Sequence, residues 1–168
     1  SPWRLLALDF NCLCEMWPDY PLWRDFPYEY EHDRLAIDLI EAPAAGCCGA
    51  LRHHLQGRQA AINDMRRLID AWWPYLEDGV EAIVSTASGC GAQLREYGAL
   101  LEDDPAYAAK ASRIAALTRD VSEVLASERE SLLGLLQQST ARAGQRVAYH
   151  PPCTLQHAQK INGLAESL

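Results

Sequence analysis

Short apolar runs that alternate with segments of helical period most constrain the fold of this chain. Ala36–Glu41 and Ala82–Val84 have the length and composition of buried strands, and Pro43 stops the first of them. Between the two runs, apolar residues recur at alternating steps of three and four, as on one face of an amphipathic helix: Ile62, Met65, Ile69, Trp72 and Leu76. This alternation predicts an α/β fold with a short, largely parallel sheet flanked by helices.

The same pattern predicts the remaining elements. We expect strands at 4–10 and 146–149, and an irregular loop at 15–31, where prolines interleave with aromatic residues. Asp78-Gly79 should end the first helix. Further helical segments are expected at Leu94–Leu101, from Pro105 to Leu125 with a break near Thr118, at Leu132–Leu136 before a stop at Gly144, and from Thr154 onward.

Cysteines follow the predicted strands. The adjacent Cys47 and Cys48, then Cys90, then Cys153 each come after an apolar run and before a helical segment. Because the carboxyl ends of parallel strands meet at one edge of a sheet, these thiols should face the same edge. Thiolates are soft ligands that select metals and iron–sulfur clusters, and the neighbouring glycines allow the backbone to approach a bulky inorganic group. The pattern favours such a site.

The cysteine spacing is compatible with more than one kind of site. It lacks the paired Cys-x-x-Cys of a zinc ribbon, the closely spaced run of a ferredoxin and the Cys-x-x-Cys of dithiol enzymes. A structural zinc domain for assembly could still use Cys12, Cys47, Cys48 and Cys90. A thiol/disulfide reductase stays open as a further alternative, and so do inert buried cysteines.

Composition excludes several classes of protein. The net charge of −8 and the absence of a basic run argue against nucleic acid as a partner. No apolar stretch approaches the roughly 20 residues that span a bilayer. We expect no signal peptide, and the apolar residues suffice for a core, so reduced, cytoplasmic cysteines are expected rather than a disulfide framework. Because the chain begins without Met and stops within a helical pattern, we expect a fragment.

Several motifs resemble the CCG cysteine-rich domain of glycolate oxidase iron–sulfur subunits, a domain also found in heterodisulfide reductases and lactate-utilisation proteins. The stretch with the adjacent cysteines, Glu-Ala-Pro-Ala-Ala-Gly-Cys-Cys-Gly-Ala-Leu-Arg-His-His-Leu, carries most of the resemblance. The other matching segments are 69–72, 86–92, 95–98, 116–120 and 149–157.

The resemblance implies a cluster-binding unit at 33–145 and the start of a truncated second copy at 146–168. By motif, Cys47, Cys48 and Cys90 are ligands of a 4Fe–4S cluster, which is non-cubane in characterised relatives. Cys153 matches the lone first cysteine of the second copy. Residues 1–32 form an unmatched, irregular N-terminal segment, in which Cys12 and Cys14 stand 34 and 32 residues before Cys47 and are both candidates for the remaining ligand.

The function implied by the resemblance is electron transfer within an oxidoreductase of the glycolate oxidase type. A flavin-containing partner subunit, carrying FAD, would oxidise the substrate, and this chain would pass electrons toward a quinone or another acceptor. Contact with the inner face of a membrane would then arise through the complex. No catalytic residue is expected in this chain, and the sequence does not separate glycolate from lactate or another 2-hydroxy acid.

Overall fold

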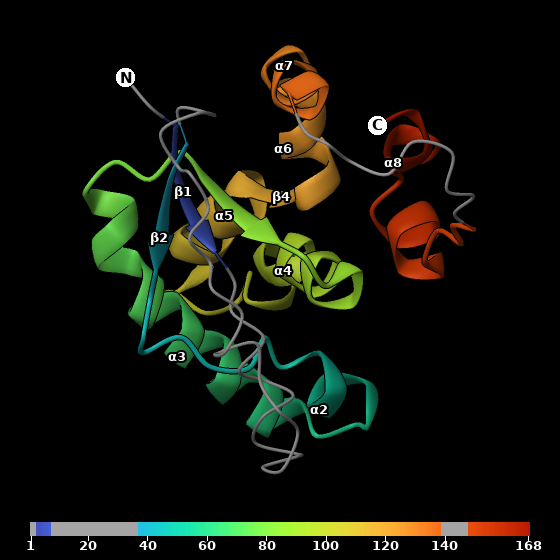
Figure 1. Cartoon of the computed structure of the whole chain (residues 1–168). Helices are drawn as coiled ribbons and strands as arrows, with labels where there is room; N and C mark the ends of the chain where they lie inside the picture. The colour runs from blue at the N-terminus through green and yellow to red at the C-terminus, as the bar shows by residue number, and fades with distance from the viewer. Residues whose placement is uncertain (1–2, 8–36, 139–147) are drawn as a thin grey trace, which may run out of the picture.

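A parallel β-sheet forms the centre of the protein (Figure 1). The computed structural model describes residues 3–7, 37–138 and 148–168. Within these ranges the sheet has four strands in the order β2-β1-β3-β4, and every pair is parallel. The strands are β1 (Trp3–Ala7), β2 (Ile37–Glu41), β3 (Ala82–Ser85) and β4 (Thr118–Asp120). The predicted α/β class with a parallel sheet is confirmed.

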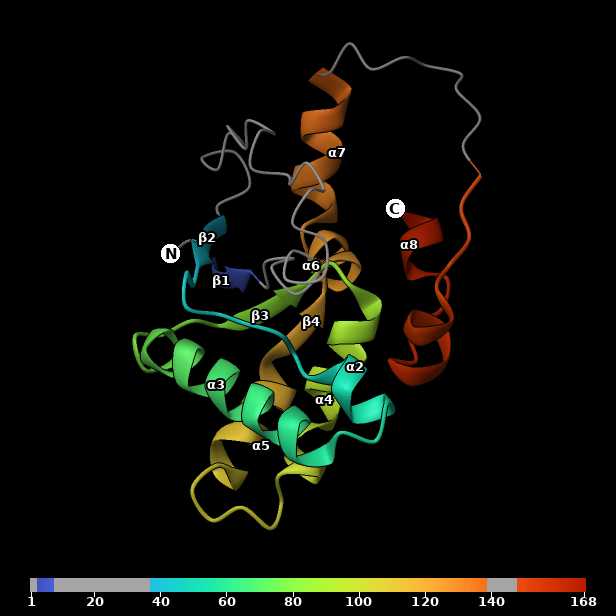
Figure 2. The same ribbon diagram turned by 90° about the horizontal axis from the view of Figure 1, so that it is seen from below.

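Helices cover both faces of this sheet, as Figure 2 shows. Residues of α3, α4 and α5 pack with Ile83 into the larger core, whereas Val121 and Val124 of α6 pack with Leu5 on the opposite face. The helices are α2 (Ala50–His54), α3 (Arg58–Glu77), α4 (Ser88–Leu100), α5 (Ala108–Leu117), α6 (Val121–Ser127), α7 (Arg129–Gln138) and α8 (Leu164–Ser167), with a π-helical turn η3 at Thr154–Ala158.

The N-terminal strand is central to the sheet, although it comes first in the sequence. β1 pairs with β2 on one side and with β3 on the other, so that Leu6 lies opposite both Ile40 and Ile83. The strand expected at 4–10 is thus observed at 3–7, and residues 8–10 lie outside the described ranges, as does the loop expected at 15–31. The fold of the unit that follows depends on a strand from the N-terminal segment.

Helix α3 confirms the period seen in the sequence. Met65, Ile69, Trp72 and Leu76 are buried, and Ile62 packs at the edge of the same core. The helix ends at Glu77, and Gly79 follows with a φ of 91°, a left-handed conformation that glycine adopts without strain. The predicted stop at Asp78-Gly79 is confirmed.

The helical segment expected from Pro105 to Leu125 differs from its prediction at its start and at its break. Helix α5 begins at Ala108 rather than at Pro105, because Asp104 accepts a hydrogen bond from the Ala106 N–H and holds a turn there. The break near Thr118 is a β-strand, β4. Asp120 then begins α6 with a capping box. Its carboxylate accepts a hydrogen bond from the Ser122 N–H, and the Glu123 carboxylate accepts one from the Asp120 N–H.

The C-terminal segment also departs from the expectation. Ala148 and Tyr149 do not form part of a strand, while residues 146 and 147, like the expected stop at Gly144, lie outside the described ranges. A strand needs a neighbour for its hydrogen bonds, and none of the described strands pairs with this segment. The helix expected from Thr154 is a single π-helical turn, η3, followed by the short α8.

The sheet directs both cysteine-bearing loops to one edge. β2 and β3 run in the same direction, and the chain leaves their carboxyl ends toward Cys47 and Cys90 respectively. Among the described residues, no helix combines the length and the apolar character needed to cross a membrane.

Replacement of the central core residue Ile83 should destabilise the whole unit. Its side chain is fully buried between the sheet and its helices, so Ile83→Ala should lower the free energy of unfolding by about 2–5 kcal/mol. Leu39→Ala is the control, because Leu39 is 41% exposed and its loss should cost less than about 1 kcal/mol. Urea denaturation followed by circular dichroism measures both values, and equal losses would contradict this packing.

Candidate metal centre

The loop after β2 presents the adjacent cysteines at the start of α2. Cys48 is buried and Cys47 is partly exposed, so the two side chains lie in different environments. Gly49 caps the helix with a φ of 81°, and its N–H donates to Cys47 Sγ at 3.4 Å. A Cβ at this position would lie 2.9 Å from the Ala61 carbonyl oxygen. Only glycine therefore fits the turn that follows the cysteine pair.

The first turn of α4 brings the third cysteine to the pair. Cys90 is partly buried, and its Sγ lies 3.3 Å from Cys48 Sγ, with the Cys48 thiol as donor. The two residues are 42 positions apart in the sequence. The prediction that these cysteines face one edge of the sheet agrees with this contact.

Tyr97, on the same helix as Cys90, holds the backbone of the cysteine pair. Its hydroxyl donates to the Cys48 carbonyl oxygen at 2.8 Å, and the side chain is fully buried. Burial raises the pKa of Tyr97 well above its usual value, and the neighbouring cysteines and Asp64 raise it further. The phenol therefore keeps its proton and its role as a donor. The sequence pattern places Tyr97 on the buried face of a helix but does not reveal this bond.

Cys48 is a protonated thiol in the metal-free protein. Its hydrogen bond with Cys47 lowers its pKa, but the bond with Cys90, burial and the charge of Cys90 together raise the pKa to about 12. Metal ligation requires the thiolate, so binding at this site has to release the proton.

The space around the cysteines suits an inorganic group. A Cβ added at Gly46 or at Gly89 would meet no atom within 4 Å, so both loops are open beside Cys47 and Cys90. The contact between Cys48 Sγ and Cys90 Sγ is shorter than the separation of about 3.8 Å expected for two thiolates on one tetrahedral ion. Within the described ranges, no group of three or more His, Cys, Asp or Glu side chains is arranged to hold a metal ion as it stands. The fit to a metal or cluster therefore rests on the chemistry of the three sulfur donors, which are the ligands that such groups select.

Cys153 lies in the segment that packs on α4. Its side chain is exposed, and the next residue, Thr154, has its hydroxyl oxygen 2.6 Å from the Ser88 hydroxyl oxygen. Ser88 begins the helix that carries Cys90, two residues further on. Cys12 and Cys14, the candidates for a further ligand, lie outside the described residues.

A buried carboxylate stabilises the turn that follows the cysteine pair. Asp64 on α3 is almost fully buried, and Arg52 of α2 lies 2.8 Å from both of its oxygens. Arg67 pairs with the same carboxylate. Because Asp64 also lies against Gly49, this ion pair connects α3 to the turn that orients the cysteines. Buried charges are retained only when paired in this way.

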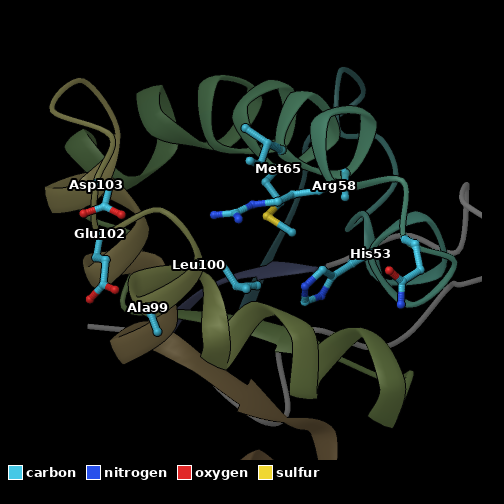
Figure 3. A pocket seen from close by; sticks show the side chains of 10 residues that line it. His53, Arg58, Met65, Ala99, Leu100, Glu102 and Asp103 are labelled. Carbon is cyan, nitrogen blue, oxygen red and sulfur yellow. The ribbon is translucent and has the colours of Figure 1, made fainter.

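A polar hollow of about 350 Å³ opens on the other side of α2. Figure 3 shows His53 at one end and Glu102 with Asp103 at the other, while the Arg58 side chain extends to the middle beside Met65. The ring of His53 lies 3.4 Å from the Gln93 side chain, so this histidine has a partner outside the cysteine group. None of the four cysteines that the structure describes lines the hollow.

The geometry of these cysteines agrees with a comparison against known families. Residues 32–95 match the CCG family, which is described as a cysteine-rich domain. That range includes β2, the cysteine pair and Cys90. Over these residues the chain is similar to the cysteine-rich domain of that family.

Individual relatives extend the match beyond this domain. The chain is 46% identical to the glycolate oxidase iron-sulfur subunit of Escherichia coli (strain K12) over 136 residues, which are 81% of this chain and 32% of that protein. It is 32% identical to YkgE of the same organism over 73% of this chain and 47% of the relative. The probable glycolate oxidase iron-sulfur subunit of Bacillus subtilis (strain 168) is 35% identical over 52% of this chain and 19% of its own length.

The chain thus spans about a third of the length of the Escherichia coli subunit and about half that of YkgE. No solved structure matches it.

The turn after the cysteine pair should not tolerate a side chain. Gly49→Ala introduces a Cβ at positive φ and against the Ala61 carbonyl, so it should lower the free energy of unfolding by more than about 1 kcal/mol. Gly46→Ala is the matched control, since a Cβ there meets open space and its effect should be small. Urea denaturation of the metal-free protein measures both, and a neutral Gly49→Ala would show that the turn is not required.

Proposed function

We propose that Cys47, Cys48 and Cys90 hold an iron–sulfur cluster and that the chain transfers electrons. The observation that carries this proposal is the 3.3 Å contact between Cys48 Sγ and Cys90 Sγ, which joins two loops at the carboxyl edge of one parallel sheet. Thiolates are the ligands that hold such clusters, and a bound cluster supplies one-electron chemistry. The names of the relatives, iron-sulfur subunits of glycolate oxidase, support the same role.

The surroundings of the three cysteines would tune that chemistry. The Gly49 N–H already donates to Cys47 Sγ, and hydrogen bonds to ligand sulfurs change the reduction potential of a cluster. Cys48 is buried and Cys47 is partly exposed, so one side of the site is shielded from water and the other is accessible. Such a site can exchange electrons with a partner across its exposed side.

The fourth ligand of a 4Fe–4S cluster is proposed to come from Cys12 or Cys14. β1 ends at Ala7, which lies opposite Glu41 of β2 and Val84 of β3. β1 therefore ends at the same edge of the sheet as the strands that precede Cys47 and Cys90. Cys12 comes five positions after Ala7 and Cys14 seven positions after it, and an extended chain spans about 3.3 Å for each residue.

We also propose how the chain divides into units. We place the first cluster-binding unit at 33–145, completed by β1 from the N-terminal segment, and the start of a second unit at 146–168 with Cys153. The substrate oxidation of a glycolate oxidase would take place on a flavin-containing partner subunit with FAD. This chain would then pass electrons to a quinone or another acceptor in the cytoplasm or at the membrane surface.

A thiol/disulfide reductase is the second candidate, because two thiols already touch in the metal-free protein. Reductases of this kind attack with a thiolate. The pKa of Cys48, raised to about 12, keeps this thiol protonated near neutral pH and makes it a poor nucleophile. Disulfide exchange at Cys48 would therefore be slow near neutral pH, and the names of the relatives leave the cluster as the first candidate.

Anaerobic reconstitution tests the proposal directly. Protein supplied with iron and sulfide under reducing conditions should develop broad visible absorption and retain both elements after gel filtration. Metal analysis and an absorption spectrum provide the measurement. A colourless protein that instead retains stoichiometric zinc would support a structural zinc domain for assembly.

Cysteine variants should separate the first site from Cys153. Cys48→Ser and Cys90→Ser each remove a sulfur of the contacting pair, so each should lose most of the bound iron. Cys153→Ser removes an exposed sulfur of the following segment and should retain the wild-type iron content. Iron per chain after reconstitution is the readout. Equal loss in all three variants would place Cys153 in the same site.

A further inference from the structure

A glutamine from the C-terminal segment lies directly on the turn that carries Cys90. Gln159 is 6% exposed, and its Nε2 donates to the Ser88 carbonyl oxygen at 2.9 Å. Its carboxamide lies over Gly91, where an added Cβ would be 2.9 Å from Nε2 and 3.2 Å from Oε1. Glycine at position 91 therefore leaves room for this side chain.

A second hydrogen bond joins the same two elements. The hydroxyl oxygens of Ser88 and Thr154 lie 2.6 Å apart, so η3 is attached to the first turn of α4 through both the side chain and the backbone of Ser88. Thr154 and Gln159, which make these two bonds, are five positions apart. The π-helical turn between them brings both onto the same side.

The first turn of α4 needs such support from outside. The residue before it, Ala87, provides no side-chain cap, so the helix start lacks the usual local stabilisation. Gly89 and Gly91 flank Cys90, and glycine lowers the stability of a helix because it gains the most conformational freedom on unfolding. A ligand on this turn would be poorly positioned without a tertiary contact.

One polar atom of the Gln159 side chain lacks a hydrogen-bond partner in this position. Its Oε1 is buried and has no hydrogen-bond partner among the described residues. Leaving a buried acceptor unpaired costs free energy, and an apolar side chain of similar volume would avoid that cost. The presence of a carboxamide here indicates that its donor, which binds Ser88, serves a purpose beyond filling space.

We propose that Gln159 is a positioning residue for Cys90. Its bond to Ser88 holds the first turn of α4 in place, and this keeps Cys90 Sγ beside Cys48 Sγ. The consequence for a cluster rests on the proposed function, whereas the clamp itself is a property of the metal-free fold. The C-terminal segment thus helps to form the first cysteine site, although it lies more than 60 residues beyond Cys90.

Hydrogen exchange of the metal-free protein tests the clamp. In Gln159→Ala, the first hydrogen-bonded amides of α4, at 91–94, should exchange roughly five- to tenfold faster, the factor expected from losing one hydrogen bond. Gly91→Ala should have a similar effect, because its Cβ displaces Gln159. The two effects should not add in the double variant, since the clash disappears with the glutamine. Fully additive effects would overturn the proposal.

Two further variants separate the hydrogen bond from packing. Gln159→Met keeps the side-chain volume and loses the donor, so it should exchange as fast as Gln159→Ala. Wild-type exchange in the Met variant would overturn the role of the hydrogen bond. Gln156→Ala is the matched control, because Gln156 donates to the Pro151 carbonyl within its own segment and its loss should leave exchange at 91–94 unchanged.

Iron release gives the second readout. After reconstitution, Gln159→Ala should lose iron to a chelator several times faster than the wild type and Gln156→Ala, with a changed electron paramagnetic resonance spectrum. If the wild type binds a cluster and Gln159→Ala releases iron at the same rate, the proposal is wrong. If the wild type binds no cluster, the proposed function fails, and the exchange experiment alone decides whether the clamp exists.

Discussion

Parallel pairing on both sides of β1 is the constraint on which the rest of the structure depends. It fixes the direction of β2 and β3, and thereby sends the loops to Cys47 and Cys90 from the same edge of the sheet. Residues 42 positions apart can then bring their sulfurs to 3.3 Å. The site is therefore a result of topology, in the way that ligand sites of parallel α/β sheets usually are.

Local interactions then set the details of that site. Gly49 turns the chain at positive φ, Tyr97 holds the Cys48 carbonyl, and Asp64 joins α3 to the same turn through Arg52. Each comes from a different element, so no single helix or loop determines the geometry. The buried, protonated Cys48 beside the more exposed Cys47 gives the site an inner and an outer side. These features together support a cluster-binding role.

The sequence predicts the helix with a regular apolar period and the strands that precede the cysteines. The period of α3 and the strands before Cys47 and Cys90 were visible because apolar burial leaves a regular trace. β4 was seen only as a break, since Thr118–Asp120 is too short to show any period.

The contacts of Tyr97 and Gln159 were not predictable, because each joins residues far apart in the sequence through one polar atom. The C-terminal strand was expected from local composition, but a strand requires a neighbour that composition does not reveal. The assignment of individual cysteines as ligands stays a prediction.

The position of β1 has a consequence for synthesis of the protein. Leu6 is made well before one of its two partners, Ile83, which emerges 77 residues later. A nascent chain must therefore keep an apolar strand unpaired on one side until β3 has left the ribosome, and contacts of such large sequence separation form slowly. During that interval the strand offers its free hydrogen-bonding edge to other chains. Chaperone protection of this strand would thus matter most until β3 has been synthesised.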